Sequence, residues 1–500
     1  MVSNVITPPR VLSMEEYQAQ WKPQGWQLIV IGPTATWRQE WDEWAAIRDI
    51  VQNALDEAES YRWGYDDRGL WISDRGRGIA VANFLLGPPK LKPDWARGKF
   101  GEGMKIAALA LIRKGYSVHI QTGNKEIWII FLEQEAEGKV QTLAALWRPL
   151  ATSHTGTKFH ILGYFGKSFA DRFAVNLPRQ AILAEGPSQI TQPVRRFNQL
   201  IKTPEGQKSR IYVRDIYLQD IDSPFSYNLW SFELSPDRFG PKREDDLWMD
   251  MGRLWCCITK QELLETLIKM TLDPPLIFST ECGRLNLSTW SLGTEPVTGK
   301  SYTEFVQENA AVWRKAWSEV SGEAKVIRTD DRWDGTVKHL GYESTSVSWH
   351  VRDTLGEVVL TDAALVKASQ EKLREAQVIP DTQLSFRQRA SLKLAREIAQ
   401  KTLPYNPVAA VHAAIIPPAS DRVRTAGMYS RTTREIFLSS DILEHAQTAI
   451  DTVIHEIAHH TSGAEDLEER HAAAMTEVAA RVVKNTAAGY FDDLLKEVVW

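Results

Sequence analysis

The chain has 500 residues, of which 43% are hydrophobic and 25% are charged, as in globular proteins and unlike disordered or fibrous ones. Its formal net charge of −5 carries no overall nucleic-acid signature, although a local basic patch stays possible. The three cysteines, two of them adjacent at Cys256 and Cys257, make neither a disulfide framework nor a cysteine-rich metal site. A chain of this length is expected to form roughly three or four domains.

The N-terminal residues and the hydropathy of the chain indicate its compartment. Residues 1–18 lack the apolar segment of a signal peptide. No apolar run reaches the length of about 18 residues that a membrane-spanning helix needs. We therefore expect no membrane association and a cytoplasmic protein.

The first long element is an amphipathic helix, expected over residues 41–59 after a short strand at 26–31. Its apolar residues recur at steps of three and four positions and form one stripe, which contains Trp44, Ile47, Val51, Ala54, Leu55 and Ala58. Asp49 and Asn53 are four residues apart, so both project from one face. This pair can orient a water molecule and hold a hard cation through oxygen. An ordinary acidic surface helix is the alternative.

A strand expected over residues 70–79 comes next. It carries Asp74 at its end, followed by Gly76 and Gly78. The segment 79–97 contains prolines and a glycine, which exclude a long helix, and we expect a loop or lid there.

A glycine-rich turn then opens a strongly helical run over residues 98–115. The turn contains Gly98, Gly101 and Gly103, and Lys105 follows in the helix. Such a turn presents backbone N–H groups to an anion, and the glycines allow a phosphate to approach closely. Lys105 adds a positive charge, so the segment is a candidate phosphate site. Strand-like runs follow at 116–123, 126–133, 141–148 and 156–165.

Four motifs thus occur in a fixed order: an acid–Asn helix, a strand ending in Asp-x-Gly-x-Gly, a Gly-x-x-Gly-x-Gly turn, and Thr-Gly-Thr at 155–157. Together they resemble the GHKL ATPase family, which includes gyrase, the large heat-shock chaperone, mismatch-repair ATPases and histidine kinases. The resemblance covers residues 20–165. It implies a Bergerat α/β sandwich that binds ATP and Mg²⁺.

The resemblance also implies roles for single residues. Asn53 would ligate the Mg²⁺ that bridges the phosphates, and Asp49 would position the water that attacks ATP. Family members that hydrolyse ATP usually carry Glu at the position of Asp49, so the shorter side chain puts efficient hydrolysis in doubt. Asp74 would bind the adenine amino group, supported by Thr157. Gly76 and Gly78 would let the base and the lid pack closely. The phosphates would be wrapped by Gly98, Gly101 and Gly103, together with Lys105.

Residues 171–300 are expected to form a second α/β unit, with a strand at 210–219 and a helix at the end of 246–272. In several GHKL proteins a following domain sends a basic residue to the γ-phosphate, and the candidates here are Arg238, Lys242 and Arg243. Residues 301–374 are mixed and polar, with a helix at 302–319, and we interpret them as a connector or small subdomain.

The C-terminal part, 375–500, is expected to be mainly helical with a small sheet. A clear helix is predicted at 386–403, and a proline-bearing loop follows at 404–425. A strand or hairpin at 427–440 then leads into a helix at 441–461.

That last helix carries the second chemical motif, the sequence HEIAH at 455–459. His455 and His459 lie four residues apart on one face, which suits two imidazoles on one Zn²⁺. Glu456 is angled to act as a general base on water. His460 is expected at the surface or beside the ligands, and His471 is expected to pack. The motif resembles that of zincin metallopeptidases, over residues 375–485.

A zincin needs a third protein ligand. In zincins with a glycine turn, this ligand follows the second His by about six residues. Here Gly463 is followed by Glu465 and Asp466, six and seven residues after His459. We expect Asp466 first and Glu465 second. Two other acids are within reach, namely Glu469 and Glu477.

The two motif sets predict an ATP-controlled zinc endopeptidase with the cofactors ATP, Mg²⁺ and Zn²⁺, a protein or peptide substrate and an ATP-dependent homodimer. The alternative is an ATP-operated clamp or chaperone-like module on nucleic acid or protein, whose zincin-like domain serves docking or structure. A third possibility is that ATP is bound but barely hydrolysed. The expected fold class is α+β in four parts, at 1–170, 171–300, 301–374 and 375–500.

Overall fold

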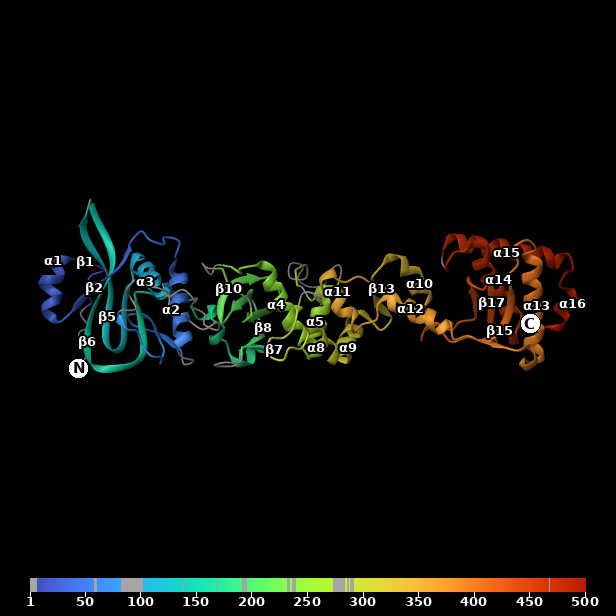
Figure 1. The fold of residues 1–500 in the computed structure, drawn as a ribbon, viewed down its shortest axis with the longest axis horizontal. Helices are drawn as coiled ribbons and strands as arrows, with labels where there is room; N and C mark the ends of the chain where they lie inside the picture. The colour runs from blue at the N-terminus through green and yellow to red at the C-terminus, as the bar shows by residue number, and fades with distance from the viewer. Residues whose placement is uncertain are drawn as a thin grey trace.

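The computed structural model shows a mixed α/β protein whose folded units follow one another along one long axis (Figure 1). The N-terminal unit lies at one end and the C-terminal unit at the other. The expected mixed multidomain architecture is confirmed. The structure describes residues 7–57, 61–81, 102–136, 138–167, 169–190, 196–231, 234–235, 240–272, 284–285, 287, 292–466 and 468–500.

A six-stranded sheet forms the N-terminal unit, in the order β1-β5-β6-β4-β3 with β2 also on β6. The four strand-like runs expected between 116 and 165 are two long antiparallel strands, because pairing continues through their polar middles with register shifts around Gly123. The strands are β1 (Val11–Ser13), β2 (Gln27–Thr34), β3 (Arg62–Asp66), β4 (Gly69–Ser73), β5 (Ser117–Ala136) and β6 (Gly138–Leu162).

The two helices of the predicted nucleotide motifs cover one face of this sheet. They are α2 (Glu43–Glu57) and α3 (Gly103–Arg113), and their apolar stripes share one buried core with the sheet. The helix expected over 41–59 is thereby confirmed over Glu43–Glu57, and residues 58–60 lie outside the described part of the chain. The other face carries a tryptophan-rich core, to which the short π-helix η1 (Tyr17–Trp21) contributes Tyr17 and Trp21. This π-helix is flanked in the chain by α1 (Met14–Glu16) and η2 (Lys22–Gln24).

The next unit holds a five-stranded sheet in the order β10-β9-β11-β8-β7. The single strand expected over 210–219 is wrong, because the chain turns back at Arg214 and Asp215, whose φ angles are 50° and 73°. Asn228 braces this turn by exchanging hydrogen bonds with Asp215. The strands are β7 (Ile182–Ile190), β8 (Arg196–Lys202), β9 (Ser209–Val213), β10 (Ile216–Ile221) and β11 (Phe225–Leu229).

The core of this unit continues past residue 300, where the sequence places a domain boundary. One cluster of buried side chains runs from Leu200 to Val359. It takes in the helices α4 (Glu244–Cys256), α5 (Gln261–Thr271), α8 (Tyr302–Glu308), α9 (Ala310–Ser321) and α11 (Trp349–Gly356). The helix expected at 302–319 is thus two helices.

A small separate core marks what we call the 325–373 subdomain, from which α11 is excluded because it packs in the preceding core. The parallel pair β12 (Lys325–Ile327) and β13 (Glu343–Thr345) packs with α10 (Asp334–His339) and α12 (Asp362–Leu373). Ala419, from the C-terminal unit, joins this core. The subdomain therefore lies against the unit that follows it.

The C-terminal unit combines a four-stranded sheet, in the order β14-β15-β17-β16, with four helices. β16 (Gly427–Ser430) is an edge strand antiparallel to β17 (Glu435–Ser439), which confirms the expected hairpin. The helix expected at 386–403 is confirmed as α13. The remaining elements are β14 (Gln377–Ile379), β15 (Ala410–Ile415), α13 (Phe386–Thr402), α14 (Ala446–Ser462), α15 (Glu469–Ala487) and α16 (Asp492–Glu497).

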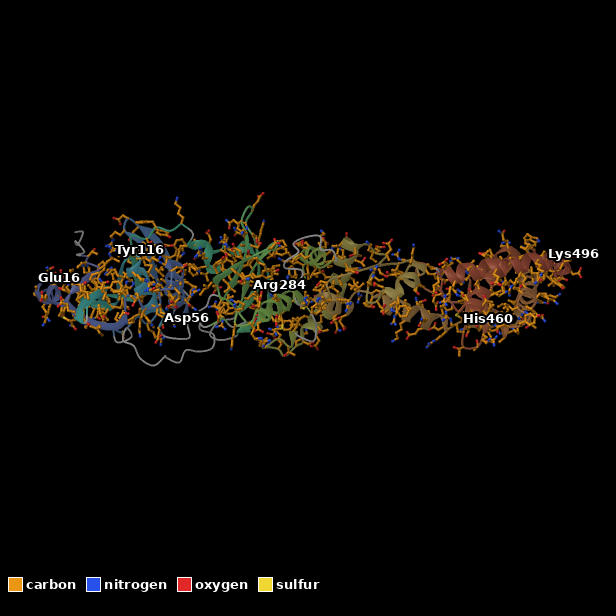
Figure 2. All side chains as sticks on the ribbon, turned by 90° about the horizontal axis from the view of Figure 1, so that it is seen from above. Glu16, Asp56, Tyr116, Arg284, His460 and Lys496 are labelled. Atoms are coloured by element: carbon orange, nitrogen blue, oxygen red, sulfur yellow. The ribbon has the colours of Figure 1, made fainter. Side chains whose placement is uncertain are left out.

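The two predicted sites lie in units at opposite ends of the molecule. Figure 2 shows Asp56, on the helix of Asn53, far along the chain axis from His460, on the helix of the histidine motif. Among the described residues, none of the helices is both long and apolar enough to cross a membrane.

Candidate metal centre and anion-binding site

The α14 helix positions the two histidines of the metal motif. Its apolar side, which includes Val453 and Ile457, is buried in the C-terminal core, so the motif sits on a fixed surface. At its end Gly463 adopts a left-handed conformation with φ of 62°, and its N–H caps the carbonyl of His459. This turn folds the chain back toward the histidines.

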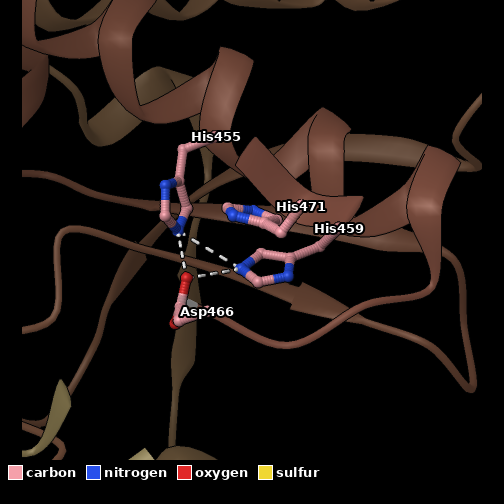
Figure 3. Close-up of side chains that lie close together, drawn as sticks. All are labelled: His455, His459, Asp466 and His471. Atoms are coloured by element: carbon pink, nitrogen blue, oxygen red, sulfur yellow. Dashed lines mark hydrogen bonds and ion pairs between the residues drawn. The ribbon is translucent and has the colours of Figure 1, made fainter. Parts of the chain in front are cut away.

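Three side chains meet at one point (Figure 3). The Nε2 atoms of His455 and His459 are 3.2 Å apart. Asp466 Oδ1 lies 2.9 Å from the first and 3.2 Å from the second. With ligand bonds of roughly 2.0–2.1 Å, two ligands of a tetrahedral zinc lie roughly 3.3 Å apart. The spacing of these donor atoms therefore fits zinc.

The charges and hydrogen bonds of the cluster favour a cation. His459 Nδ1 lies 2.9 Å from the carbonyl oxygen of Ala464, which directs Nε2 into the cluster. Burial works to raise the pKa of Asp466, but the contacts with His455 and His459 outweigh it and hold that pKa far below its usual range. The carboxylate is thus negatively charged at neutral pH.

The structure separates the candidates for the third ligand. Among the four acids, all in the described part of the chain, Asp466 alone contacts the histidines. Glu465 points outward to Arg431, at 2.8 Å. Glu477 pairs with Arg481, and Glu469 is exposed at the start of α15. A turn through Gly463 presents only one of the adjacent acids to the site.

His471 joins the cluster, although sequence reasoning gave it only a packing role. Its ring stacks on His459 with centroids 4.1 Å apart and lies 4.7 Å from His455. It is 3% exposed, and its Nε2 has no hydrogen-bond partner among the described residues. The possible ligand atoms of all four residues lie within 4.8 Å of one another. The signal in the sequence was its place on the buried stripe of α15, with Val478 and Val482.

Glu456 lies between this cluster and the edge strand. A Cβ on Gly427 of β16 would come within 2.9 Å of Glu456 Oε1 and 2.5 Å of Thr452 Cγ2, so strand and helix are in close contact. Burial raises the pKa of Glu456 to about 7. His460 is not part of the cluster, since its ring nitrogens contact the Tyr429 hydroxyl at 2.8 Å and the Asn406 carbonyl at 3.0 Å.

The acid–Asn pair of the N-terminal unit lies against the start of α3. Asn53 donates to the backbone oxygen of Asp49 at 2.8 Å and to its carboxylate at 2.9 Å. A Cβ on Gly103 would be 2.3 Å from both carboxylate oxygens of Asp49. Lys105 is buried, and burial lowers its pKa. Gly98 and Gly101 lie outside the described residues.

A second group of predicted residues gathers around Asp74 at the end of β4. Its Oδ1 accepts N–H bonds from Gly76 at 2.7 Å and from Thr157 at 3.2 Å. Burial raises the pKa of Asp74. Gly78 has φ of 79°, and a Cβ there would be 2.8 Å from the Thr122 hydroxyl. Asp74 at the end of β4 and Thr157 in β6 thus form one buried polar group.

Three basic residues of the second unit were expected to reach a nucleotide, and the structure describes two of them, Lys242 and Arg243. Arg243 pairs with Asp246 in its own segment, at 3.9 Å. Arg238 lies outside the described residues, and Lys242 precedes α4.

Gly103→Ala should destabilise the N-terminal unit by about 1–3 kcal/mol, because overpacking at a tight contact costs that much. The new methyl group would displace the Asp49 carboxylate. Urea denaturation followed by tryptophan fluorescence measures the change. Gly240→Ala is the control, since a Cβ there meets nothing within 4 Å. Equal midpoints for the two variants would contradict the close contact.

A scan against models of known protein families and a search of curated proteins find no match to this chain. The two family resemblances therefore rest on the motifs of this chain and on their geometry.

Proposed function

We propose that the chain is a zinc-dependent endopeptidase controlled by a nucleotide-binding unit at its N-terminal end. The convergence of His455, His459 and Asp466 beside the buried Glu456 carries this proposal. Two imidazoles, a carboxylate and a neighbouring acid are the groups that hydrolysis of a peptide bond with zinc requires.

Each side chain of the cluster has a role in this chemistry. His455, His459 and Asp466 would hold zinc, which acts when bound as a Lewis acid that polarises a carbonyl group and lowers the pKa of water. Glu456, with its pKa of about 7, can accept a proton from the attacking water near neutral pH. It can then return this proton to the leaving amine.

The edge strand supports a peptide as substrate. Among the described strands β16 pairs with β17 alone, and Gly427 brings β16 close to Glu456. An extended peptide can pair with the outer side of such a strand through backbone hydrogen bonds. A backbone bound there would pass close to the general base.

The N-terminal unit supports the nucleotide part of the proposal. Asn53 would ligate Mg²⁺, and Asp74 would accept a hydrogen bond from adenine. Gly103 lies at the start of α3, a helix end where an anion is favoured, and the Asp49 carboxylate of α2 lies against it. The two sites lie in units at opposite ends of the chain (Figure 2), so nucleotide control would act through the middle units or through an ATP-dependent dimer.

Zinc content and chelation test the peptidase proposal. We expect about one zinc per purified chain, the stoichiometry of a single site with these ligands. Cleavage of a casein substrate should stop on treatment with a strong chelator and return on addition of zinc. Metal-free protein that cleaves casein equally well would refute the proposal.

One observation favours the alternative function, a clamp whose C-terminal unit serves docking or structure. His471 offers a fourth buried donor, and structural zinc sites are closed by four protein ligands whereas catalytic sites keep a position open.

His471→Ala separates the two functions. For a catalytic site we expect zinc affinity to fall by less than the roughly 10–100-fold cost of losing an outer-shell partner, and cleavage to persist. A larger loss of zinc affinity in His471→Ala, together with a wild-type chain that does not cleave casein, would favour the closed, structural site. Chelator competition and casein cleavage give the two readouts.

A further inference from the structure

The carboxylate of Asp466 has a second partner outside the C-terminal unit. Its Oδ1 faces His455 and His459, whereas its Oδ2 lies 3.3 Å from Nε2 of His339. His339 is the last residue of α10, in the 325–373 subdomain. A carboxylate of the metal cluster thus bridges two units of the chain.

The subdomain is also held at a second point, directly after His339. Ser420 donates to the carbonyl of Leu340 at 2.8 Å, and the Tyr342 hydroxyl donates to the Asp421 carboxylate. A Cβ on Gly341 would come within 2.9 Å of Arg422 Cβ, so the two backbones approach closely. These contacts fix the end of α10 relative to the C-terminal unit.

We propose that His339 is a positioning residue of the metal centre, so that docking of the 325–373 subdomain sets zinc affinity. The inference rests on the zinc site of the proposed function. The His339 ring beside Oδ2 would fix the plane of the Asp466 carboxylate and keep Oδ1 toward the histidines. Loss of such an outer-shell partner costs roughly 10–100-fold in metal affinity.

The strand β12 connects this contact to the rest of the chain. Its adjacent residues Val326 and Ile327 are buried in different cores, that of the subdomain and that of the unit before it. Ile327 also forms a bridge with Thr361, next to α12. β12 therefore joins the subdomain that carries His339 to the unit before it.

Zinc affinity of the full chain, measured by competition with a chromophoric chelator, tests this role. We expect His339→Ala to weaken zinc binding by roughly 10–100-fold, and His339→Gln, which keeps an N–H donor, to lie closer to wild type. The control is Lys338→Ala, an exposed neighbour on the same helix, which should bind as wild type does. The visible spectrum of the cobalt-loaded protein should change in His339→Ala alone.

A remote variant tests the docking step. Tyr342→Phe removes the bond to Asp421 and should weaken zinc binding, with little further effect in the His339→Ala background. Wild-type affinity in His339→Ala would overturn the inference while leaving the zinc site intact. A wild-type chain that binds no zinc would overturn both the inference and the proposed function. If zinc binding depends on His339 but the chain does not cleave casein, the result would support the inference and refute only the proposed peptidase activity.

Discussion

Glu456→Gln should abolish peptide cleavage and leave zinc bound. Gln has nearly the shape of Glu but cannot accept a proton, and a positioned general base contributes about 10²–10⁴-fold to a rate. The three proposed zinc ligands, His455, His459 and Asp466, are other residues, so the metal content should stay at the wild-type value. Cleavage rate and zinc content of the same preparation are the measurement.

The matched control is Glu465→Gln, which makes the same chemical change on an exposed residue beyond the end of the helix. Glu465 pairs with Arg431 at the surface, and its loss should leave the rate unchanged. Cleavage that survives in Glu456→Gln would assign the base to another residue. Loss of zinc in that variant would instead show that Glu456 supports the metal.

Asp466→Ala should lower zinc affinity more than the replacement of any other single acid in the C-terminal unit by Ala. Its carboxylate contacts both histidines, so the loss should exceed the roughly 10–100-fold effect of an outer-shell partner. Without it the two imidazoles also lose the negative charge that favours a cation. Chelator competition measures the change.

The other candidate acids serve as controls for Asp466. Glu469→Ala and Glu477→Ala remove exposed carboxylates, the second of them paired with Arg481, and both variants should bind zinc like wild type. If either of them lost zinc and Asp466→Ala did not, the third ligand would be assigned wrongly.

Local patterns predicted the helices of both motifs. α2 and α14 each carry an apolar stripe that a core buries, so their periodicity alone located them. The β9–β10 hairpin was missed because its turn uses Arg214 and Asp215 at positive φ, where Gly or Asn is usual. The runs on both sides of the turn, 211–213 and 216–218, are rich in β-branched and aromatic residues, so together they resemble one strand.

The composition of the metal cluster could be predicted only in part. Residues 455–466 are close in sequence, and the turn at Gly463 determines which acid reaches the histidines. His471 enters through the packing of α15 on α14, and His339 enters through the docking of a separate subdomain. Such contacts depend on tertiary structure, which spacing along the chain does not encode.

The effect of Mg-ATP on peptide cleavage by the zinc-loaded full chain tests the central claim most directly. Nucleotide control predicts that Mg-ATP changes the cleavage rate of wild type and leaves that of Asn53→Ala unchanged, because this variant lacks the amide that would ligate Mg²⁺. Glu456→Gln should cleave nothing with or without nucleotide. A wild-type rate that is the same with and without Mg-ATP, under conditions where ATP binding is measured, would contradict the claim.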